Sequence, residues 1–370
     1  MKVPFLDLPA QHATIRSEIE SAINDVLNSG AFALGPTVDR FETEFAEYVG
    51  AEYCVGLNSG TSALHLALLA AGVGPGDEVI TTPHTWISTS WGISYAGGTP
   101  VYVDVDAATG NLDPSLVEAA ITSRTKVILP VDLYGSPADH AALEEIAQTH
   151  HLLLIDDAAQ AHGASLDGRP IGSFGFATCW SFYPGKNLGA AGEGGAVVTD
   201  DPAVAGRIRS LRDHAQVGRH NHVEVGFNAR MDGLQGAVLS VKLKHLDDWN
   251  DGRREAAARY QRLLEDIDGV TLPTSIRRAK PAWHLYVIRV PDRDAIGEAF
   301  AAAGIGSGVH YPKPVHLQPA YAHLGYEPGS LPHAEAFAAT CISLPMFPEI
   351  TSEQQQHVAD VIVDSMERVA

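Results

Sequence analysis

Seven short apolar segments constrain the fold of this 370-residue chain more than any other feature of its sequence. They are nearly continuous apolar runs with little polar alternation, so each predicts a strand that is covered on both faces. Strands of this kind form mostly parallel α/β sheets with helices packed on either side, and such sheets bind ligands at the carboxyl ends of their strands. The predicted strands are residues 52–57, 77–82, 99–106, 125–135, 151–157, 177–183 and 194–200.

Helical patterns surround this series and suggest two domains. Apolar residues recur at helical spacing or form buried helical runs at 12–29, 38–48, 62–72, 139–151 and 231–246. After Gly269 the segments become shorter, as in the apolar run 282–290, and the loops become rich in Pro, Gly and His. We therefore expect a large domain at 1–245, with an N-terminal helical segment, and a smaller C-terminal α+β domain at 246–370.

The stretch from Ser181 to Gly195, SFYPGKNLGAAGEGG, places a single lysine, Lys186, among proline and glycines that exclude a regular helix. Glycines at this density indicate a sharp turn or a close approach to another group. A lysine held there is typical of a Schiff-base nucleophile, because burial or a neighbouring cation lowers the pKa of its ammonium group. The alternative is an exposed loop lysine, and this stretch alone does not decide between them.

Two other motifs follow predicted strands. Asn58-Ser59-Gly60-Thr61-Ser62 opens a predicted helix, where free N–H groups favour a phosphate, although a simple N-cap is the commoner role. Trp86 follows strand 77–82 and could stack on a flat heteroaromatic ring, although a core aromatic is again the commoner role.

A pair of carboxylates, Asp156 and Asp157, ends the strand 151–157. Buried carboxylates are costly unless paired, and a pyridine nitrogen is one partner that would be kept protonated by such a group. One of the two could instead cap a helix. Gln160 could bind a hydroxyl group on the same ring, and Ser181 could add a phosphate contact. The four motifs together indicate a cofactor site.

Composition excludes several classes of protein. The formal charge of −20 argues against a nucleic-acid partner. Three scattered cysteines suit free thiols in a reducing compartment, and no secretion signal or membrane-length apolar run is found, so we expect a cytoplasmic protein without membrane contact. The loop histidines lack zinc-ligand spacing, and no metal is expected.

The motifs resemble the fold type I pyridoxal-phosphate (PLP) enzymes of the sugar aminotransferase family (DegT/StrS type). The resemblance runs from residue 3 to about residue 351 and is carried by NSGTSAL, GDEVITTPHTW, PVDLYG, IDDAAQAHGA, SFYPGKNLGAAGEGGAVVTD and GFNARMDGLQGAVL. It implies that the domain 1–245 binds PLP. It also implies a homodimer whose active sites are shared across the interface.

The resemblance also implies a role for each motif. Lys186 would form the Schiff base, Asp157 would face the pyridine nitrogen, Trp86 would stack on the ring and Gln160 would contact the ring hydroxyl. The implied phosphate ligands are Gly60, Thr61, Ser62 and Ser181, with Asn228 reaching the phosphate of the neighbouring subunit.

Within the family, the chain looks most like the branch that aminates C3 of a dTDP-linked 3-keto-6-deoxyhexose with L-glutamate as donor. Tyr183 stands where many members have histidine, and Tyr183, His310 and Tyr311 are candidate substrate contacts. His310 and Tyr311 could equally pack against nearby prolines. Asp132 also replaces a histidine common in PVHLYG, which suggests altered local substrate contacts.

Four alternatives remain open at this point. The enzyme could aminate C4 of a nucleotide sugar or a keto-cyclitol. It could be a PLP-dependent sugar dehydratase, although such relatives replace the lysine or add an iron–sulfur cysteine set. A nicotinamide-dependent oxidoreductase would need G-x-G-x-x-G after the first strand, which is missing. A non-catalytic regulatory role is also compatible with the fold.

Overall fold

A seven-stranded sheet forms the centre of the protein in the computed structural model, which describes residues 1–369. The strand order is β1-β9-β8-β5-β4-β2-β3, and β9 alone runs antiparallel to its two neighbours. All seven predicted strands are confirmed, and so is the mostly parallel α/β arrangement. The strands are β1 (Tyr53–Leu57), β2 (Glu78–Thr81), β3 (Thr99–Tyr102), β4 (Thr125–Leu129), β5 (Leu153–Asp157), β8 (Ala177–Ser181) and β9 (Gly195–Thr199).

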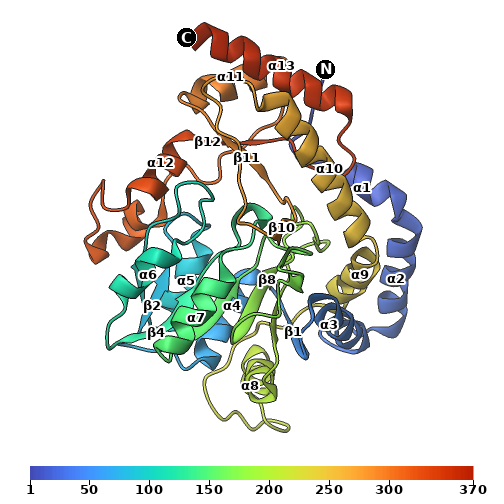
Figure 1. The fold of residues 1–370 in the computed structure, drawn as a ribbon. Helices are drawn as coiled ribbons and strands as arrows, with labels where there is room; N and C mark the ends of the chain where they lie inside the picture. Colours follow the sequence, from blue (N-terminus) through green and yellow to red (C-terminus); the bar gives the residue numbers. More distant parts are fainter. Residues whose placement is uncertain (370) are drawn as a thin grey trace.

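Helices cover both faces of this sheet (Figure 1). On one face α4 and α8 pack against side chains such as Leu57 and Ile155. On the other face α3 and α9 pack against Trp180, while α6 and α7 pack against Leu154. The helices of this part are α1 (Leu8–Thr14), α2 (Arg16–Ser29), α3 (Pro36–Val49), α4 (Gly60–Ala70), α5 (Ser88–Tyr95), α6 (Pro114–Ala120), α7 (His140–Thr149), α8 (Pro202–Arg212) and α9 (Gly233–Leu243).

The predicted helix 12–29 is interrupted. Ile15 leaves helical geometry (φ −122°, ψ 14°) and separates α1 from α2. The side chain of Asp7 caps α1 by accepting the N–H of Ala10, so the first helix begins earlier than its apolar stripe suggested. Ile15 is nevertheless buried, as its place in the stripe indicates.

The C-terminal part is smaller and has its own apolar core beneath α10, α11 and α13. The predicted run 282–290 contains β11, which pairs antiparallel with β12. Val3 also belongs to this core, because its backbone pairs with Ile305. The elements are α10 (Leu246–Leu264), β11 (Tyr286–Arg289), α11 (Arg293–Ala303), α12 (Pro332–Thr340), β12 (Cys341–Leu344) and α13 (Ser352–Val369). The domain division near residue 245 stays a prediction.

Short elements connect the two parts. A three-stranded sheet joins β6 (Ser165–Leu166) and β7 (Arg169–Pro170) to β10 (Ala279–Lys280). Three 3₁₀ helices, η1 (Leu133–Gly135), η2 (Val315–Leu317) and η3 (Pro319–Leu324), lie in the loops. Across residues 1–369, no helix combines the length and the apolar character that a bilayer crossing requires.

Candidate active site

Lys186 lies in the tight turn that follows β8. The turn is compact because a side chain at Gly189 would meet the carbonyl oxygen of Pro184. The amide of the next residue, Asn187, is anchored in the interior, where its Nδ2 donates to Asn250 Oδ1 and to the carbonyl of Ala282, both at 2.8 Å. The backbone of this turn therefore fixes the position of Lys186.

The environment of Lys186 favours a neutral amine. Burial lowers the pKa of its ammonium group to about 8, and the carboxylate of Asp157 opposes this shift. The charge of this ammonium group also acts on three imidazoles. The sequence analysis named one of them, His310, as a candidate substrate contact, and it named none of them as a neighbour of the lysine. Burial lowers the pKa of His162 to about 3, that of His310 to about 4 and that of His284 well below its usual value. The lysine therefore has neutral imidazoles and one carboxylate around it.

Asp157 ends β5 and is 5% exposed. Its Oδ2 accepts the hydroxyl of Thr89 at 2.7 Å and its Oδ1 accepts the N–H of Ala159 at 3.2 Å. Burial raises the pKa of this carboxyl, while Thr89, Ala159 and the charge of Lys186 lower it. A carboxylate so placed lacks a close permanent cation in the described chain, and a protonated ring nitrogen would fit it.

Asp156 faces the other side of the sheet, because successive strand residues point in opposite directions. Its carboxyl group is buried beside His140, away from Thr89 and Lys186. Of the two carboxylates, Asp157 is thus the one on the side of Thr89, and its role towards a cofactor stays a prediction.

The N-terminus of α4 lies against the end of β8. A Cβ added at Gly60 would be 2.6 Å from Ser181 Cβ, so only glycine allows this approach. Ser59 caps the helix by accepting the N–H of Ser62 at 3.1 Å, and Thr61 Oγ1 donates to Ser88 Oγ at 3.0 Å. Hydroxyl groups and free helix N–H groups therefore gather here, which fits a phosphate group.

Trp86 and Tyr311 form an aromatic edge of the site. Their ring centroids are 5.5 Å apart, and Trp86 is 56% exposed in the single chain. Gln160 connects this edge to the interior: its Nε2 donates to the hydroxyl of Tyr311 at 3.2 Å, and its Oε1 accepts the N–H of Tyr134 at 2.6 Å. A contact from Gln160 to a ring hydroxyl stays a prediction.

Two further sequence candidates, Tyr183 and Asn228, lie on the surface of the chain. Tyr183 is 56% exposed. Asn228 lies beside Asp213, and its Oδ1 accepts Arg230 Nη2 at 3.1 Å. His310, by contrast, is partly buried, with Nδ1 2.7 Å from Ser343 Oγ and its ring stacked on Phe5.

Asp132 lies in the interior, and its predicted effect on local substrate contacts stays a prediction. Its side chain is fully buried and points to His140, whose Nε2 lies 2.9 Å from Asp132 Oδ1. Sequence reasoning could not find this pair, because the helix α7 that carries His140 had no motif to connect it with the loop after β4.

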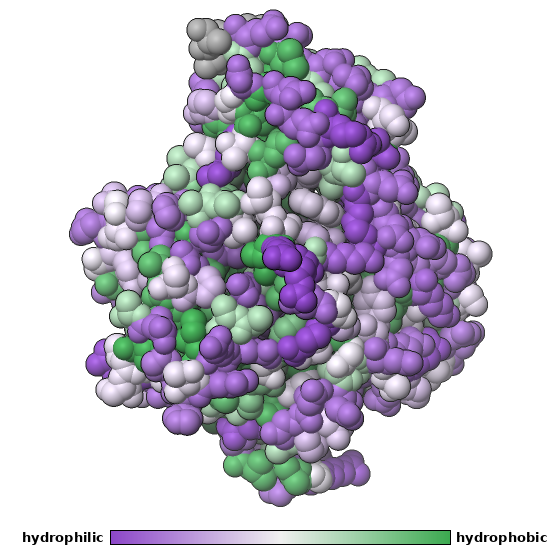
Figure 2. Space-filling model, in the orientation of Figure 1, coloured by the Kyte–Doolittle hydropathy of each residue, from purple (hydrophilic) through white to green (hydrophobic). Residues whose placement is uncertain are grey.

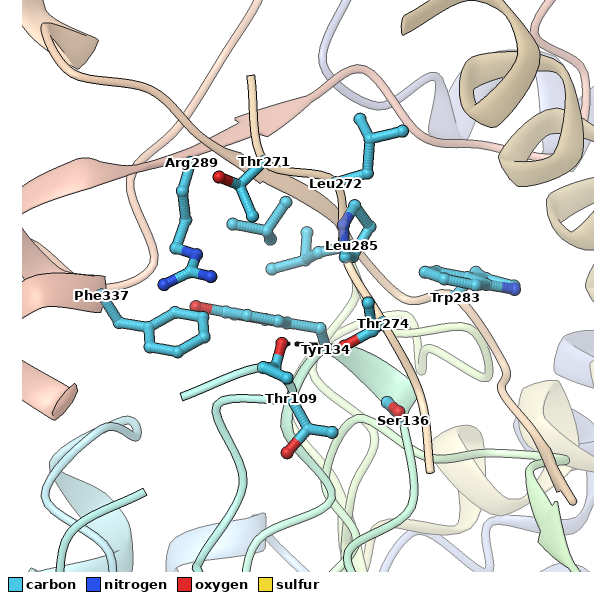
Figure 3. A pocket seen from close by; sticks show the side chains of 13 residues that line it. Thr109, Tyr134, Ser136, Thr271, Leu272, Thr274, Trp283, Leu285, Arg289 and Phe337 are labelled. Carbon is cyan, nitrogen blue, oxygen red and sulfur yellow. Dashed lines mark hydrogen bonds between the residues drawn. The ribbon is translucent and has the colours of Figure 1, made fainter. Parts of the chain in front are cut away.

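A separate small cavity lies behind the site, between η1 and the β11 region (Figure 3). Arg289 points its guanidinium group towards the ring of Phe337, at 4.3 Å from the ring centroid, and towards Tyr134. Lys186 and Asp157 do not line this cavity. Tyr134 separates the two spaces, since its hydroxyl binds His84 Nε2 at 2.8 Å and its N–H binds Gln160.

Comparisons with known proteins show relatives that match nearly the whole chain. The chain is 51% identical over 358 residues to the erythromycin biosynthesis sensory transduction protein EryC1 of Saccharopolyspora erythraea, covering 97% of this chain and 98% of that protein. It is 47% identical over 368 residues to the dTDP-3-amino-3,4,6-trideoxy-alpha-D-glucose transaminase of Streptomyces venezuelae, covering 100% of this chain and 97% of that protein.

Solved structures show the same fold. The crystal structure of S. venezuelae DesV in complex with a ketimine intermediate matches with a TM-score of 0.98 at 47% identity, covering 100% of both chains. Other solved relatives, 32% and 29% identical, include PMP-bound and PLP forms. The model of the DegT/DnrJ/EryC1/StrS aminotransferase family matches residues 13–363. The resemblance is thus confirmed, and this chain belongs to the DegT/DnrJ/EryC1/StrS aminotransferase family.

Proposed function

We propose that this aminotransferase transfers the amino group of L-glutamate to C3 of a dTDP-linked 3-keto-6-deoxyhexose, with PLP as its cofactor, and so forms an amino sugar. Transamination of a nucleotide-linked keto sugar follows from the family and from the named activity of the S. venezuelae relative. The observation that carries the proposal is that Lys186, with its lowered pKa, follows β8 while buried Asp157 ends the neighbouring parallel strand β5, so that each charge acts on the pKa of the other.

The residues present fit the cofactor. Lys186 would hold it covalently, Asp157 would face its ring nitrogen, and Trp86 would cover its ring. Gly60, Thr61, Ser62 and Ser181 would surround its phosphate. When bound, PLP supplies a protonated pyridine ring that withdraws electrons from the carbon bearing the amino group.

Lys186 would also move the proton in each half of the reaction. With the cofactor and glutamate bound, Nζ would take the proton from the donor α-carbon, and in the second half it would give a proton to C3 of the sugar. Because its pKa is about 8 in the folded chain, the neutral base is accessible near neutral pH, unlike an exposed lysine. Neutral His310 and the hydroxyl of Tyr311 would orient the sugar, and Tyr183 would contact it from the outside.

We further propose a homodimer with shared active sites. Trp86 and Tyr183 are more than half exposed although they border the site, which suggests that a second subunit covers them. The loop after α8 carries exposed valines, Val217, Val223 and Val225, and hydrophobic side chains gather at this end of the molecule (Figure 2). This loop, with Asn228, would reach the partner's phosphate site.

Three buried free cysteines support the proposed cytoplasmic location.

The test is turnover of purified protein with L-glutamate and a panel of keto sugars, with the product sugar analysed for the aminated carbon. Formation of a 3-amino sugar nucleotide supports the proposal. A 4-amino sugar or an amino cyclitol would support the C4 or cyclitol alternative. Loss of a hydroxyl group without nitrogen transfer would support the dehydratase alternative. If no substrate is converted, the result would support the regulatory alternative.

A further inference from the structure

Three ionisable side chains, Asp132, His140 and Asp156, meet in the interior on the far side of β5 from Lys186. They come from the loop after β4, from the start of α7 and from β5 itself. His140 Nε2 is 2.9 Å from Asp132 Oδ1 and 3.7 Å from Asp156 Oδ2. None of the three is more than 1% exposed, and the ring of Phe174 is stacked on His140.

This cluster is short of partners. Asp132 Oδ1 accepts the N–H of Ala138 at 2.7 Å, but Asp132 Oδ2, both oxygens of Asp156 and His140 Nδ1 have no hydrogen-bond partner among residues 1–369. Within the described chain, His140 is the one basic side chain in ion-pair distance of either carboxylate. Two ionised carboxylates beside a single imidazole ring would leave a net negative charge in the buried interior, which is strongly unfavourable.

A proton fits this arrangement better than a metal ion. Ligand bonds of about 2.0–2.2 Å in a tetrahedral site would hold the ligand atoms more than about 3.2 Å apart. The 2.9 Å between His140 and Asp132 is instead a hydrogen-bond distance. If one of the two carboxyl groups is protonated, its O–H can also donate a hydrogen bond to a carboxylate oxygen of the cluster that otherwise has no donor.

We propose that Asp156 is kept as a neutral carboxylic acid beside the hydrogen-bonded pair of Asp132 and His140, so that β5 places no second negative charge next to Asp157. Burial raises the pKa of Asp156 well above its usual value, and the charge of Asp132 raises it further.

The consequence for the active site rests on the proposed function. The negative charge of Asp132 itself raises the pKa of Asp157. A second ionised group at Asp156 would add to this repulsion and weaken the hold of Asp157 on a ring proton. Neutralising the cluster therefore keeps Asp157 available as an anion, and Asp156 and His140 act as positioning residues, not as catalytic ones.

Other groups that face Asp156 do not supply a cation. Asp157 follows it on β5, and the thiol of Cys179 lies on the neighbouring strand β8, where the pKa of the thiol is raised by burial and by both aspartates. Arg169 lies outside the cluster, with its guanidinium group over Phe174 at 3.9 Å. The proton of Asp156 should accordingly persist across neutral pH.

Infrared spectroscopy of the cofactor-free protein tests the proton directly, independently of the proposed function. We expect a carbonyl stretch of a protonated carboxyl group at pH 7 that Asp156→Asn removes. Asp132→Asn should retain the band at low pH, but the band should disappear at a lower pH than in the wild type, because the charge that raises the pKa of Asp156 is gone. This variant provides a second measurement if Asp156→Asn does not fold. Absence of the band in the wild type, or a stoichiometric metal ion that disappears in His140→Asn, would overturn the proposal.

The holoenzyme then tests the consequence for Asp157. Asp156→Asn should keep the nitrogen of ¹⁵N-labelled PLP protonated and kcat within about twofold of wild type, because asparagine copies the neutral acid. His140→Asn should lower kcat about tenfold with little change in KM, and adding Asp132→Asn should restore it by removing the unpaired charge. If the double variant is as slow as His140→Asn, or if Asp156→Asn loses the proton on the ring nitrogen, the proposal is wrong, because the cluster then does not act through the charge next to Asp157.

Discussion

Gly60→Ala should weaken binding of PLP without unfolding the protein. The new Cβ would be 2.6 Å from Ser181 Cβ and 3.1 Å from Ser181 Cα, so α4 and β8 must move apart by several tenths of an ångström. Overpacking of this kind costs about 1–3 kcal/mol. If the cost falls on the phosphate site, the Kd for PLP should rise by about 5- to 150-fold.

The assay is titration of cofactor-free protein with PLP, followed by absorbance, together with the Tm of the same sample. Gly206→Ala is the matched control: Gly206 is an exposed residue inside α8, and nothing lies within 4 Å of its added Cβ. This control should be more stable by about 0.5–1 kcal/mol with unchanged affinity. A folded Gly60→Ala protein with the wild-type Kd would refute the placement of the phosphate between Gly60 and Ser181.

Four further outcomes are expected. Lys186→Ala should lose the visible absorbance of the bound cofactor and all turnover, as measured by spectrophotometry and product analysis; retention of both would exclude Lys186 as the Schiff-base residue. Asp157→Asn should keep bound PLP but lower kcat by about 10²-fold or more, measured by steady-state kinetics; an unaffected rate would show that Asp157 does not hold the ring nitrogen. Because the pKa of Lys186 is lowered to about 8, reductive trapping of PLP on the cofactor-free protein should rise as pH increases through about 8, and a rise only above pH 10 would contradict the burial argument. Val225→Asp, at a side chain that is 84% exposed, should shift the protein from dimer to monomer in sedimentation velocity and reduce activity; an unchanged dimer would place the interface elsewhere.

The sheet could be predicted from sequence because its strands are short, buried on both faces and separated by turns. Helices without a clear apolar stripe were harder to predict from the sequence. The segment that forms α5 has buried polar residues, including Ser88, Thr89 and Ser90, and its pattern predicted no helix. Thr89 was missed for this reason, although its hydroxyl binds Asp157.

The site could be predicted only where its residues belong to motifs at strand ends. Lys186, Asp157 and Gly60 were found in this way, and the structure brings their segments together. The pairing of Asp132 with His140 depends on a loop in which Tyr134 has a positive φ of 62°, which no spacing rule anticipates. His162 and His284 approach Lys186 from segments far apart in the chain, so their contribution needed the folded structure.

Val3 forms backbone hydrogen bonds with Gly304 and Gly306, and Phe5 stacks on His310. These contacts determine the order in which this region forms during synthesis. The segment around Val3 is synthesised some three hundred residues before its backbone partners. The central sheet can assemble while these first residues are still unpaired. Phe5 then docks against His310 late, so this contact forms only after the C-terminal part has been made.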